Sequence, residues 1–287
     1  ALKDRGFEKI PSYGVEPIDV PGAVAGWMTL HERFGKLPLE EVMAPAIRYA
    51  EEGYPVTPNI SRLWQEAFEN YSKYRDRPEF QGWFDTFAPN NTWLKPGEMF
   101  RCPDMAKTLK EIAATKGEAF YRGAIAEKID AFFKKHNGFL TKEDLAAFKS
   151  EWVDPISVNY HGVDVWELPP NGHGITVLMA LQILKDMNLA ERDCADTMHK
   201  QIEAMKLAMV DTAEYVAEPS FMRVSVDQLL SEDYAAKRRA LINDKAIMPE
   251  PGDPGCPSTV YFCCADGEGN MVSFIQSNFR GFGSGIV

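Results

Sequence analysis

The sequence predicts an α+β fold in which a long helix-rich region precedes a terminal β-hairpin. Apolar residues recur at helical spacing through much of residues 21–217. Near the C-terminus, the runs 259–265 and 271–277 have the composition of paired strands. A further stretch, 153–170, switches to an apolar pattern of period two. Together these patterns indicate helices and strands in separate blocks, with most strands late in the chain.

Helices are expected in order through the first half of the chain. Two occur within 21–56, where Gly35 ends the first and Gly53 ends the second. Another covers about 60–74, and a long aromatic loop follows it. Three more are expected, and their ranges are 104–117, 119–138 and 141–149.

The second half combines strands, two strong helices and a hairpin. The period-two stretch 153–170 ends at its Pro-Pro pair, and helices are expected over 175–187 and 196–217. Residues 243–258 are rich in Pro and Gly and form the one candidate linker. The hairpin follows this linker immediately.

Composition excludes several classes of function. The chain has 287 residues, of which 45% are hydrophobic and 25% charged, as in a soluble globular protein with a sizeable core. Its net charge of -11 argues against binding to nucleic acid. No apolar run is long enough to span a membrane, so neither a membrane nor nucleic acid is an expected partner.

The cysteines and the N-terminus bear on location. Five scattered cysteines, with no C-x-x-C pair, are interpreted as free thiols that serve as small buried hydrophobes. They favour a reducing, cytoplasmic compartment, although a periplasmic or secreted location stays open. The start "ALKDRGFEKIPSYG" lacks Met, and we expect this chain to be an interior piece of a longer protein.

Thr259 begins a strand directly after the breakable linker. Taken alone, it is a β-branched residue in a position where threonine is common. A threonine at a newly made N-terminus is also a potential nucleophile, because its own α-amino group can accept the hydroxyl proton. Such an amine has a pKa of about 7.7–8.0, close to working pH.

Four segments together resemble the γ-glutamyltransferase family, which is related to the cephalosporin acylases. Three of them, "VPGAVAGWMTLHERFGKLPLEEVMAPAIRYAEEGYPV", "GFLTKEDLAAFKSEWVDPISVNYHGVDVWELPPNGHGITVLMALQIL" and "HKQIEAMKLAMVDTAEYVAEPSF", are similar to its large subunit. The fourth, "STVYFCCADGEGNMVSFIQSNFRGFGSGIV", resembles the start of its small subunit. The resemblance covers essentially the whole chain in order.

This resemblance implies an N-terminal nucleophile (Ntn) hydrolase with an αββα four-layer sandwich. It implies that the chain cuts itself between Ser258 and Thr259, whose hydroxyl becomes the nucleophile. Residues 1–258 would then be large-subunit sequence that ends in the linker 243–258, and 259–287 would begin the small subunit. The two would form a heterodimer, which could itself dimerise.

Three further site residues follow from the same resemblance. Ser277 aligns with the family's second hydroxyl, which hydrogen-bonds the nucleophile; as a strand-end residue it could equally be an ordinary polar side chain. Phe279 replaces a substrate-binding asparagine, and Asn278 lies one residue earlier. A one-residue step reverses the face of a strand, so Asn278 would substitute only across a bulge.

The expected function is acyl transfer from γ-glutamyl amides such as glutathione to water or an amine. One alternative is a broader amide hydrolase of the cephalosporin or glutaryl acylase type, which Phe279 favours. Another is a non-catalytic relative that binds or assembles. The substrate is a small molecule, and no cofactor or metal is expected, because the histidines show no ligand spacing.

Other motifs favour structural interpretations. "NGHG" at 171–174 could form an oxyanion site, but a turn that needs glycine is favoured. "GFGSG" at 281–285 is a weak phosphate-loop match and is interpreted as a backbone turn. Asp211 and Glu214 share a helix face, and an exposed acidic face or a structural aspartate explains them without catalysis.

Overall fold

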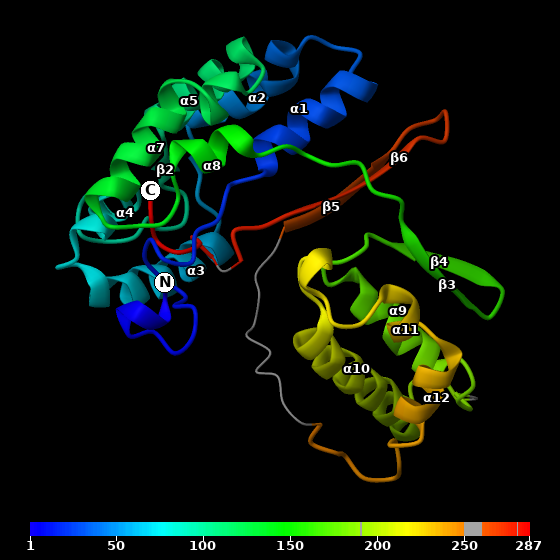
Figure 1. The fold of residues 1–287 in the computed structure, drawn as a ribbon. Helices are drawn as coiled ribbons and strands as arrows, with labels where there is room; N and C mark the ends of the chain where they lie inside the picture. Colours follow the sequence, from blue (N-terminus) through cyan, green and yellow to red (C-terminus); the bar gives the residue numbers. More distant parts are fainter. Residues whose placement is uncertain (190, 250–259, 280) are drawn as a thin grey trace. The chain divides into compact units, whose positions relative to one another are not determined.

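The computed structural model describes residues 1–189, 191–249, 260–279 and 281–287, and within them helices combine with three two-stranded sheets (Figure 1). The predicted α+β composition is confirmed. The chain divides into two compact units, the first formed by Ala1–Ser150 with Cys256–Val287 and the second by Glu151–Gly255. The terminal hairpin therefore belongs to the same unit as the first 150 residues.

The first unit is mainly helical. Its α-helices are α1 (Ala23–Phe34), α2 (Leu39–Glu52), α3 (Pro58–Tyr71), α4 (Gln81–Phe87), α5 (Pro103–Thr115), α6 (Glu118–Tyr121), α7 (Ala124–Lys135) and α8 (Lys142–Ala147). Short 3₁₀ turns lie at Lys3–Arg5, Ser72–Tyr74 and Pro78–Phe80. Its strands are β1 (Tyr54–Pro55), β2 (Met99–Phe100), β5 (Val260–Ala265) and β6 (Met271–Gln276), in the antiparallel pairs β1–β2 and β5–β6.

Local signals explain several helix boundaries. Thr57 precedes Pro58, and its hydroxyl accepts a hydrogen bond from the amide of Ile60 at the start of α3. Thr141 and Asp144 form a capping box at the start of α8, where each side chain accepts from the other residue's amide. These caps satisfy amide groups that have no partner within a helix, which is why the helices begin there.

Two predictions in this unit need correction. The helix expected over 119–138 is two helices, because Gly123 adopts a non-helical backbone (φ −120°, ψ −149°) between α6 and α7. The aromatic loop after α3 contains regular structure, since α4 continues to Phe87 and β2 pairs with β1. Short elements of this kind lack the periodicity that identifies longer ones.

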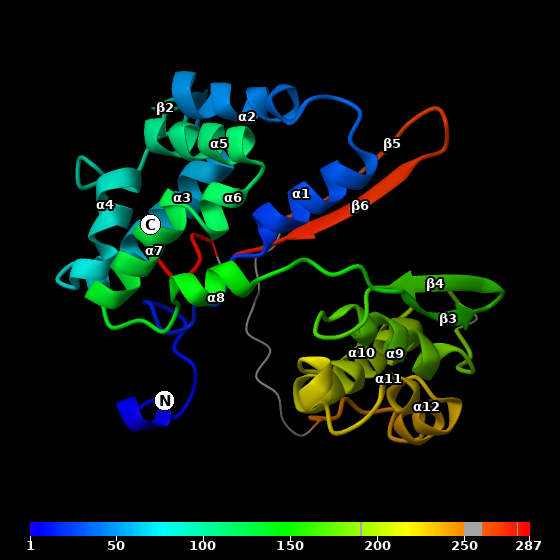
Figure 2. The ribbon, with the colours of Figure 1, turned by 45° about the horizontal axis from the view of Figure 1, so that its top comes forward.

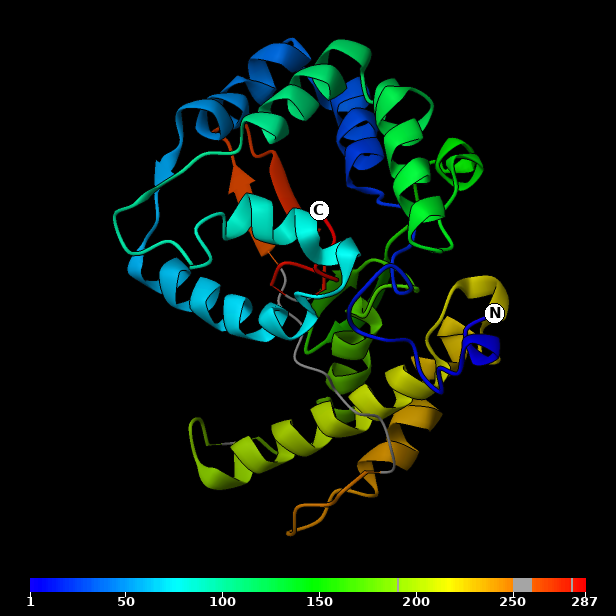
Figure 3. The same ribbon diagram turned by 90° about the vertical axis from the view of Figure 1, so that its left-hand side faces the viewer.

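Two apolar clusters form the core of the first unit. One gathers α1, α2, α5, α7 and α8 around buried residues such as Val24, Ile112 and Leu145. The other is aromatic and centres on Tyr71, Phe80 and Trp83, which are almost completely buried. Figure 3 shows the C-terminal segment ending among the helices of this aromatic cluster. Burial of large aromatic rings accounts for much of the stabilisation of such cores.

The second unit contains a hairpin and a group of helices. Its elements are β3 (Ile156–Tyr160), β4 (Val163–Glu167), α9 (Gly174–Leu184), α10 (Ala195–Tyr215), a 3₁₀ turn (Pro219–Phe221), α11 (Val226–Leu229) and α12 (Glu232–Arg239). The predicted strands and the helices α9 and α10 are confirmed. Helices α11 and α12 were not predicted, because both are short and α12 is strongly polar. No helix in the described ranges has both the length and the apolar content to cross a bilayer.

Candidate active site

The predicted site residues are sequence neighbours of the two strands of the terminal hairpin. Ser258 and Thr259 fall outside the described residues, whereas Ser277, Asn278 and Phe279 are described. Strand β5 begins at Val260, directly after Thr259 in the sequence, and β6 ends at Gln276, directly before Ser277. The described candidate residues therefore lie in the chain that leaves β6.

The hairpin has a regular antiparallel register. Val260 pairs with Gln276 at its open end, and Ala265 pairs with Met271 next to the turn. At the turn the Asp266 carboxylate accepts from the amide of Glu268 at 2.9 Å and from that of Asn270 at 3.0 Å. Hydrogen bonds from Asn270 lower the pKa of Asp266. An ionised Asp266 thus closes the turn and sets the pairing of the two strands.

Both faces of this hairpin carry exposed apolar side chains. Tyr261 and Phe262 are adjacent in β5, so they point to opposite faces, yet they are 59% and 50% exposed. Ile275 in β6 is 60% exposed. The predicted burial of cysteine is wrong here, since Cys263 and Cys264 are also exposed. An apolar run without alternation is typical of a strand covered on both faces.

Beyond β6 the backbone leaves the strand conformation. The Ser277 hydroxyl accepts a hydrogen bond from the amide of Phe279 at 2.8 Å, which closes a local turn. Phe279 has a φ of +74°, a left-handed conformation that is rare for a bulky side chain, and is 53% exposed. The described strand ends at Gln276, so the alternation of side chains across a strand does not apply to Asn278 and Phe279.

Two contacts outside the hairpin hold this region, and sequence reasoning missed both. The indole nitrogen of Trp27 in α1 donates to the side-chain oxygen of Gln276 at 3.1 Å. Figure 2 shows α1 running alongside the hairpin. The hydroxyl of Tyr71 donates to the backbone oxygen of Gly283 at 3.0 Å. Each contact joins positions more than 200 residues apart in sequence, so no local pattern could have indicated it.

The turn interpretation of "GFGSG" fits the structure. Gly281, Gly283 and Gly285 all have positive φ values, which glycine adopts without steric cost. Phe282 packs into the aromatic cluster, with ring centroids 5.5 Å from Trp83 and 4.7 Å from Phe87. The segment is thus an anchored turn directly after the site.

The carboxylates considered in α10 are structural. Asp211 is buried and forms an ion pair with Arg238 of α12 at 2.9 Å. Burial raises the pKa of Asp211, although Arg238 opposes this shift. Glu214 pairs with Arg223 at the surface. The structural interpretation of both residues is confirmed.

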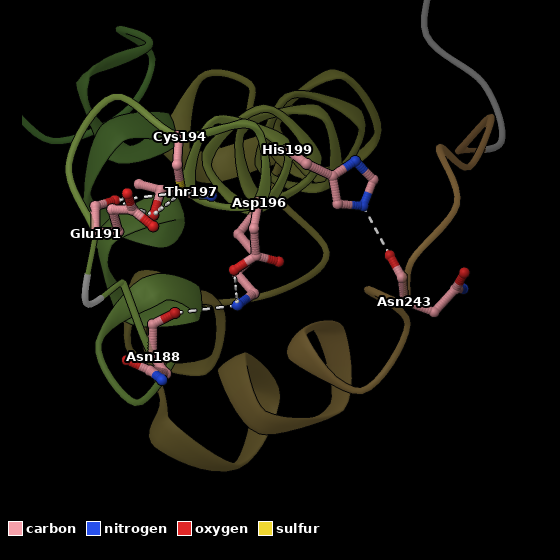
Figure 4. A network of polar contacts seen from close by, with 8 residues as sticks. Asn188, Glu191, Cys194, Asp196, Thr197, His199 and Asn243 are labelled. Atoms are coloured by element: carbon pink, nitrogen blue, oxygen red, sulfur yellow. Dashed lines mark hydrogen bonds and ion pairs between the residues drawn. The ribbon is translucent and has the colours of Figure 1, made fainter.

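A polar network at the start of α10 also has a structural explanation (Figure 4). The Cys194 sulfur accepts from the amide of Thr197 at 3.4 Å and so caps the helix. Hydrogen bonds with the side chain and the backbone amide of Thr197 lower the pKa of this thiol. Farther along α10, the His199 ring bonds the backbone oxygen of Asn243 at 2.7 Å. Within the described ranges, His, Cys, Asp and Glu form no group of three that could hold a metal ion.

The chain is similar to proteins of one known family. The chain matches the family described as Gamma-glutamyltranspeptidase over residues 1–287. It is 32% identical to the glutathione hydrolase-like YwrD proenzyme of Bacillus subtilis, over 99% of this chain and 53% of that protein. It is 33% identical to the glutathione hydrolase proenzyme of Pseudomonas aeruginosa, over 100% of this chain and 51% of that protein. The chain thus spans about half the length of the curated relatives it matches.

A solved structure is also similar. The cephalosporin acylase from Bacillus halodurans is 54% identical, with a TM-score of 0.94, and the match covers 100% of this chain and 53% of that one. The two proteins are therefore similar in backbone fold as well as in sequence over the whole of this chain.

Proposed function

The chain belongs to the gamma-glutamyltranspeptidase family and has the α+β Ntn-hydrolase fold of its solved relatives, and on this premise we propose that it is part of a self-processing acyltransferase with Thr259 as nucleophile. The donor is a γ-glutamyl amide of the glutathione type. The amide carbonyl is attacked by the threonine hydroxyl, the amine leaves, and water or a second amine takes the acyl group.

The register of the hairpin is the observation that carries this proposal. Val260 pairs with Gln276 at the open end of the hairpin. In the sequence Thr259 directly precedes Val260 and Ser277 directly follows Gln276, so the two hydroxyl residues are the sequence neighbours of one paired position. Ser277 would then orient the nucleophile.

Processing supplies the base. In the intact chain the nitrogen of Thr259 belongs to an amide and cannot accept a proton. Attack of the Thr259 hydroxyl on the Ser258 carbonyl transfers that acyl group from nitrogen to oxygen, and water then hydrolyses the ester. The products are a carboxylate on Ser258 and a free α-amino group on Thr259, whose ordinary pKa near 8 suits a general base.

The same step defines two subunits. Residues 1–258, ending in the linker 243–258, would remain as large-subunit sequence, and 259–287 would begin the small subunit. The exposed apolar side chains on both faces of β5–β6 support burial of this hairpin inside a larger sandwich. The relatives carry the word proenzyme in their names, which fits processing of this chain.

Electrophoresis of the full-length protein under denaturing conditions tests the proposal. We expect two fragments, the smaller of which begins with the sequence TVYFCC, and a single uncut band for Thr259→Ala. Ser258→Ala is the matched control, since it removes a neighbouring hydroxyl and leaves the nucleophile, and it should still be cut. A wild-type protein that stays as one band would contradict self-processing and favour a non-catalytic relative.

A second candidate, amide hydrolysis of the cephalosporin or glutaryl acylase type, is favoured by Phe279. Phe279 is 53% exposed and lies two residues after Ser277 in the sequence, at a position where the family resemblance implies an asparagine that binds substrate. A phenyl ring suits a less polar acyl group. Hydrolysis of γ-glutamyl and glutaryl anilides, measured for the wild type and Phe279→Asn, separates the two. Preference for the glutaryl anilide that reverses in the variant supports the acylase; preference for the γ-glutamyl anilide in the wild type supports the transferase.

A further inference from the structure

Tyr71 connects the aromatic core to the glycine-rich turn after the candidate site. It is the last residue of α3, and its side chain is 3% exposed. Its hydroxyl donates to the backbone oxygen of Gly283 at 3.0 Å, a buried contact. Burial raises the pKa of Tyr71 far above its usual value, with smaller effects from Tyr13 and Tyr74. The hydroxyl therefore stays protonated and able to donate throughout the working pH range.

The residues on either side of Gly283 also contact the core of the first unit. The backbone oxygen of Ser284 accepts from the amide of Gly14 at 3.0 Å. At Gly285 there is no space for a side chain, because a Cβ atom there would lie 2.5 Å from the Tyr71 ring and 2.7 Å from the Phe80 ring. With Phe282 packed among aromatic rings, four consecutive residues are fixed against the core.

This fixed turn touches the candidate site directly. A Cβ atom placed on Gly283 would lie 3.3 Å from the Asn278 Cβ and 3.4 Å from its backbone oxygen. The backbone of Gly283 therefore packs against Asn278, which follows Ser277 in the chain. A continuous path of contacts runs from the Tyr71 hydroxyl through Gly283 to the residue next to Ser277.

We propose that Tyr71 is a positioning residue for the candidate site, which acts by holding Gly283 against Asn278 and so setting the place of Ser277. This role rests on the proposed function of Ser277 as the partner of Thr259. Tyr71 would act through Gly283, to which its hydroxyl donates, rather than by touching Ser277 or substrate. Loss of its hydroxyl frees the Gly283 carbonyl to move, and displacement of a positioned group by about 1 Å can cost up to 100-fold in rate.

Tyr71→Phe is the direct test, because it keeps the ring and removes only the hydroxyl. We expect kcat for amide hydrolysis to fall on the order of tenfold, with KM little changed and self-cleavage slowed in parallel. Tyr121→Phe is the matched control. Tyr121 is also a buried tyrosine of the first unit; its hydroxyl donates to the Pro21 backbone oxygen at 2.7 Å and accepts from the Ala25 amide at 3.0 Å, and neither partner is a residue of the hairpin or of the glycine-rich turn. It should lose comparable thermal stability and retain its kcat.

A glycine pair tests the same path without altering the core. Gly283→Ala places a methyl group against Asn278, whereas Gly269→Ala places one in open space in the hairpin turn. Both glycines have positive φ, +68° and +87°, so the backbone strain of the two substitutions is similar. Gly283→Ala should lower kcat as Tyr71→Phe does, and Gly269→Ala should not.

The outcomes separate this proposal from the proposed function. All rates are measured at a temperature where circular dichroism shows each variant to be folded. If the wild type neither cuts itself nor hydrolyses amides, the proposed function fails. If the wild type does both, but Tyr71→Phe and Gly283→Ala match their controls in kcat, the positioning role is overturned. A loss of kcat confined to these two variants supports it.

Discussion

The indole nitrogen of Trp27 lies 3.1 Å from the side-chain oxygen of Gln276, and this hydrogen bond joins helix α1 to the last residue of strand β6. The same Gln276 pairs through its backbone with Val260, the first residue of β5. One side chain thus links the helical core to the open end of the hairpin. In the sequence the candidate nucleophile, Thr259, precedes Val260, and its proposed partner, Ser277, follows Gln276.

Removing this link should slow self-cleavage. We expect Trp27→Phe and Gln276→Leu each to slow it by roughly threefold to tenfold, the factor that corresponds to one neutral hydrogen bond. Because both substitutions remove the same bond, the double variant should be no slower than the slower single variant. The rates are measured by quantifying fragments over time. A double variant whose slowing equals the product of the two single effects would show that the residues act independently.

At Ser277 the hydroxyl, rather than the size of the side chain, should matter. Ser277→Ala loses both the acceptor for the Phe279 amide and the proposed contact with Thr259, so kcat should fall by about tenfold or more. Ser277→Thr keeps the hydroxyl and should retain most of the activity. Steady-state hydrolysis of an anilide substrate provides the measurement. Equal kcat values for the alanine variant and the wild type would remove Ser277 from the site.

Asp130 should contribute pH-dependent stability to the first unit. Its carboxylate, 9% exposed, accepts from the Lys134 ammonium at 2.6 Å and from the amide of Lys142 at 3.2 Å. The hydrogen bond from Lys134 lowers the pKa of Asp130 below its ordinary value of 3.8. An acid whose folded pKa is lowered stabilises the folded state above its unfolded pKa, and this contribution is lost as the pH falls through the folded pKa.

Asp130→Asn should therefore be less stable than the wild type at pH 7, and the difference should shrink below about pH 4. Urea unfolding across this pH range measures it. Asp104→Asn is the control. The Asp104 side chain is 89% exposed in its ion pair with Lys107, and because solvent screens that pair the substitution should change stability less. A difference that persists unchanged at pH 3 would mean that ionisation of Asp130 is not responsible.

The Asp211–Arg238 pair predicts a large effect on the stability of the second unit. Arg238→Met leaves a carboxylate that is 5% exposed without its partner, which should cost about 3–5 kcal/mol. Burial raises the pKa of Asp211, so protonation relieves this cost and the loss should diminish as the pH falls towards 4. Arg223→Met breaks the exposed pair with Glu214 and is the control, expected to cost at most about 1 kcal/mol. Equal losses in denaturant unfolding would contradict burial of the first pair.

Local sequence patterns were sufficient to predict most of the longer helices and strands. The helical spacing before Gly35 and Gly53 predicts α1 and α2, because a glycine residue ends each amphipathic run. Strands β5 and β6 follow from their composition and from the turn between them, where Asp266 accepts the amides that close it. Periodicity and capping are properties of neighbouring residues, so they can be read without the tertiary structure.

Short elements and long-range contacts could not be predicted in this way. Helix α12 is strongly polar and α4 has only seven residues, so neither has a clear apolar face. The left-handed conformation of Phe279 could not be predicted from the sequence either, because it depends on where strand β6 ends. The chain instead turns at Ser277, whose hydroxyl binds the Phe279 amide.

The sequence by itself determined the family, the α+β class, the hairpin and the candidate residues Thr259 and Ser277, since these depend on residue types and their order. Only the tertiary structure decided that Trp27 bonds Gln276, the residue before Ser277, and that Tyr71 bonds Gly283, which packs against Asn278, the residue after Ser277. The physical reason is distance along the chain. Each of these two hydrogen bonds closes a loop of more than 200 residues, and which distant donor meets which acceptor depends on how the whole aromatic core packs.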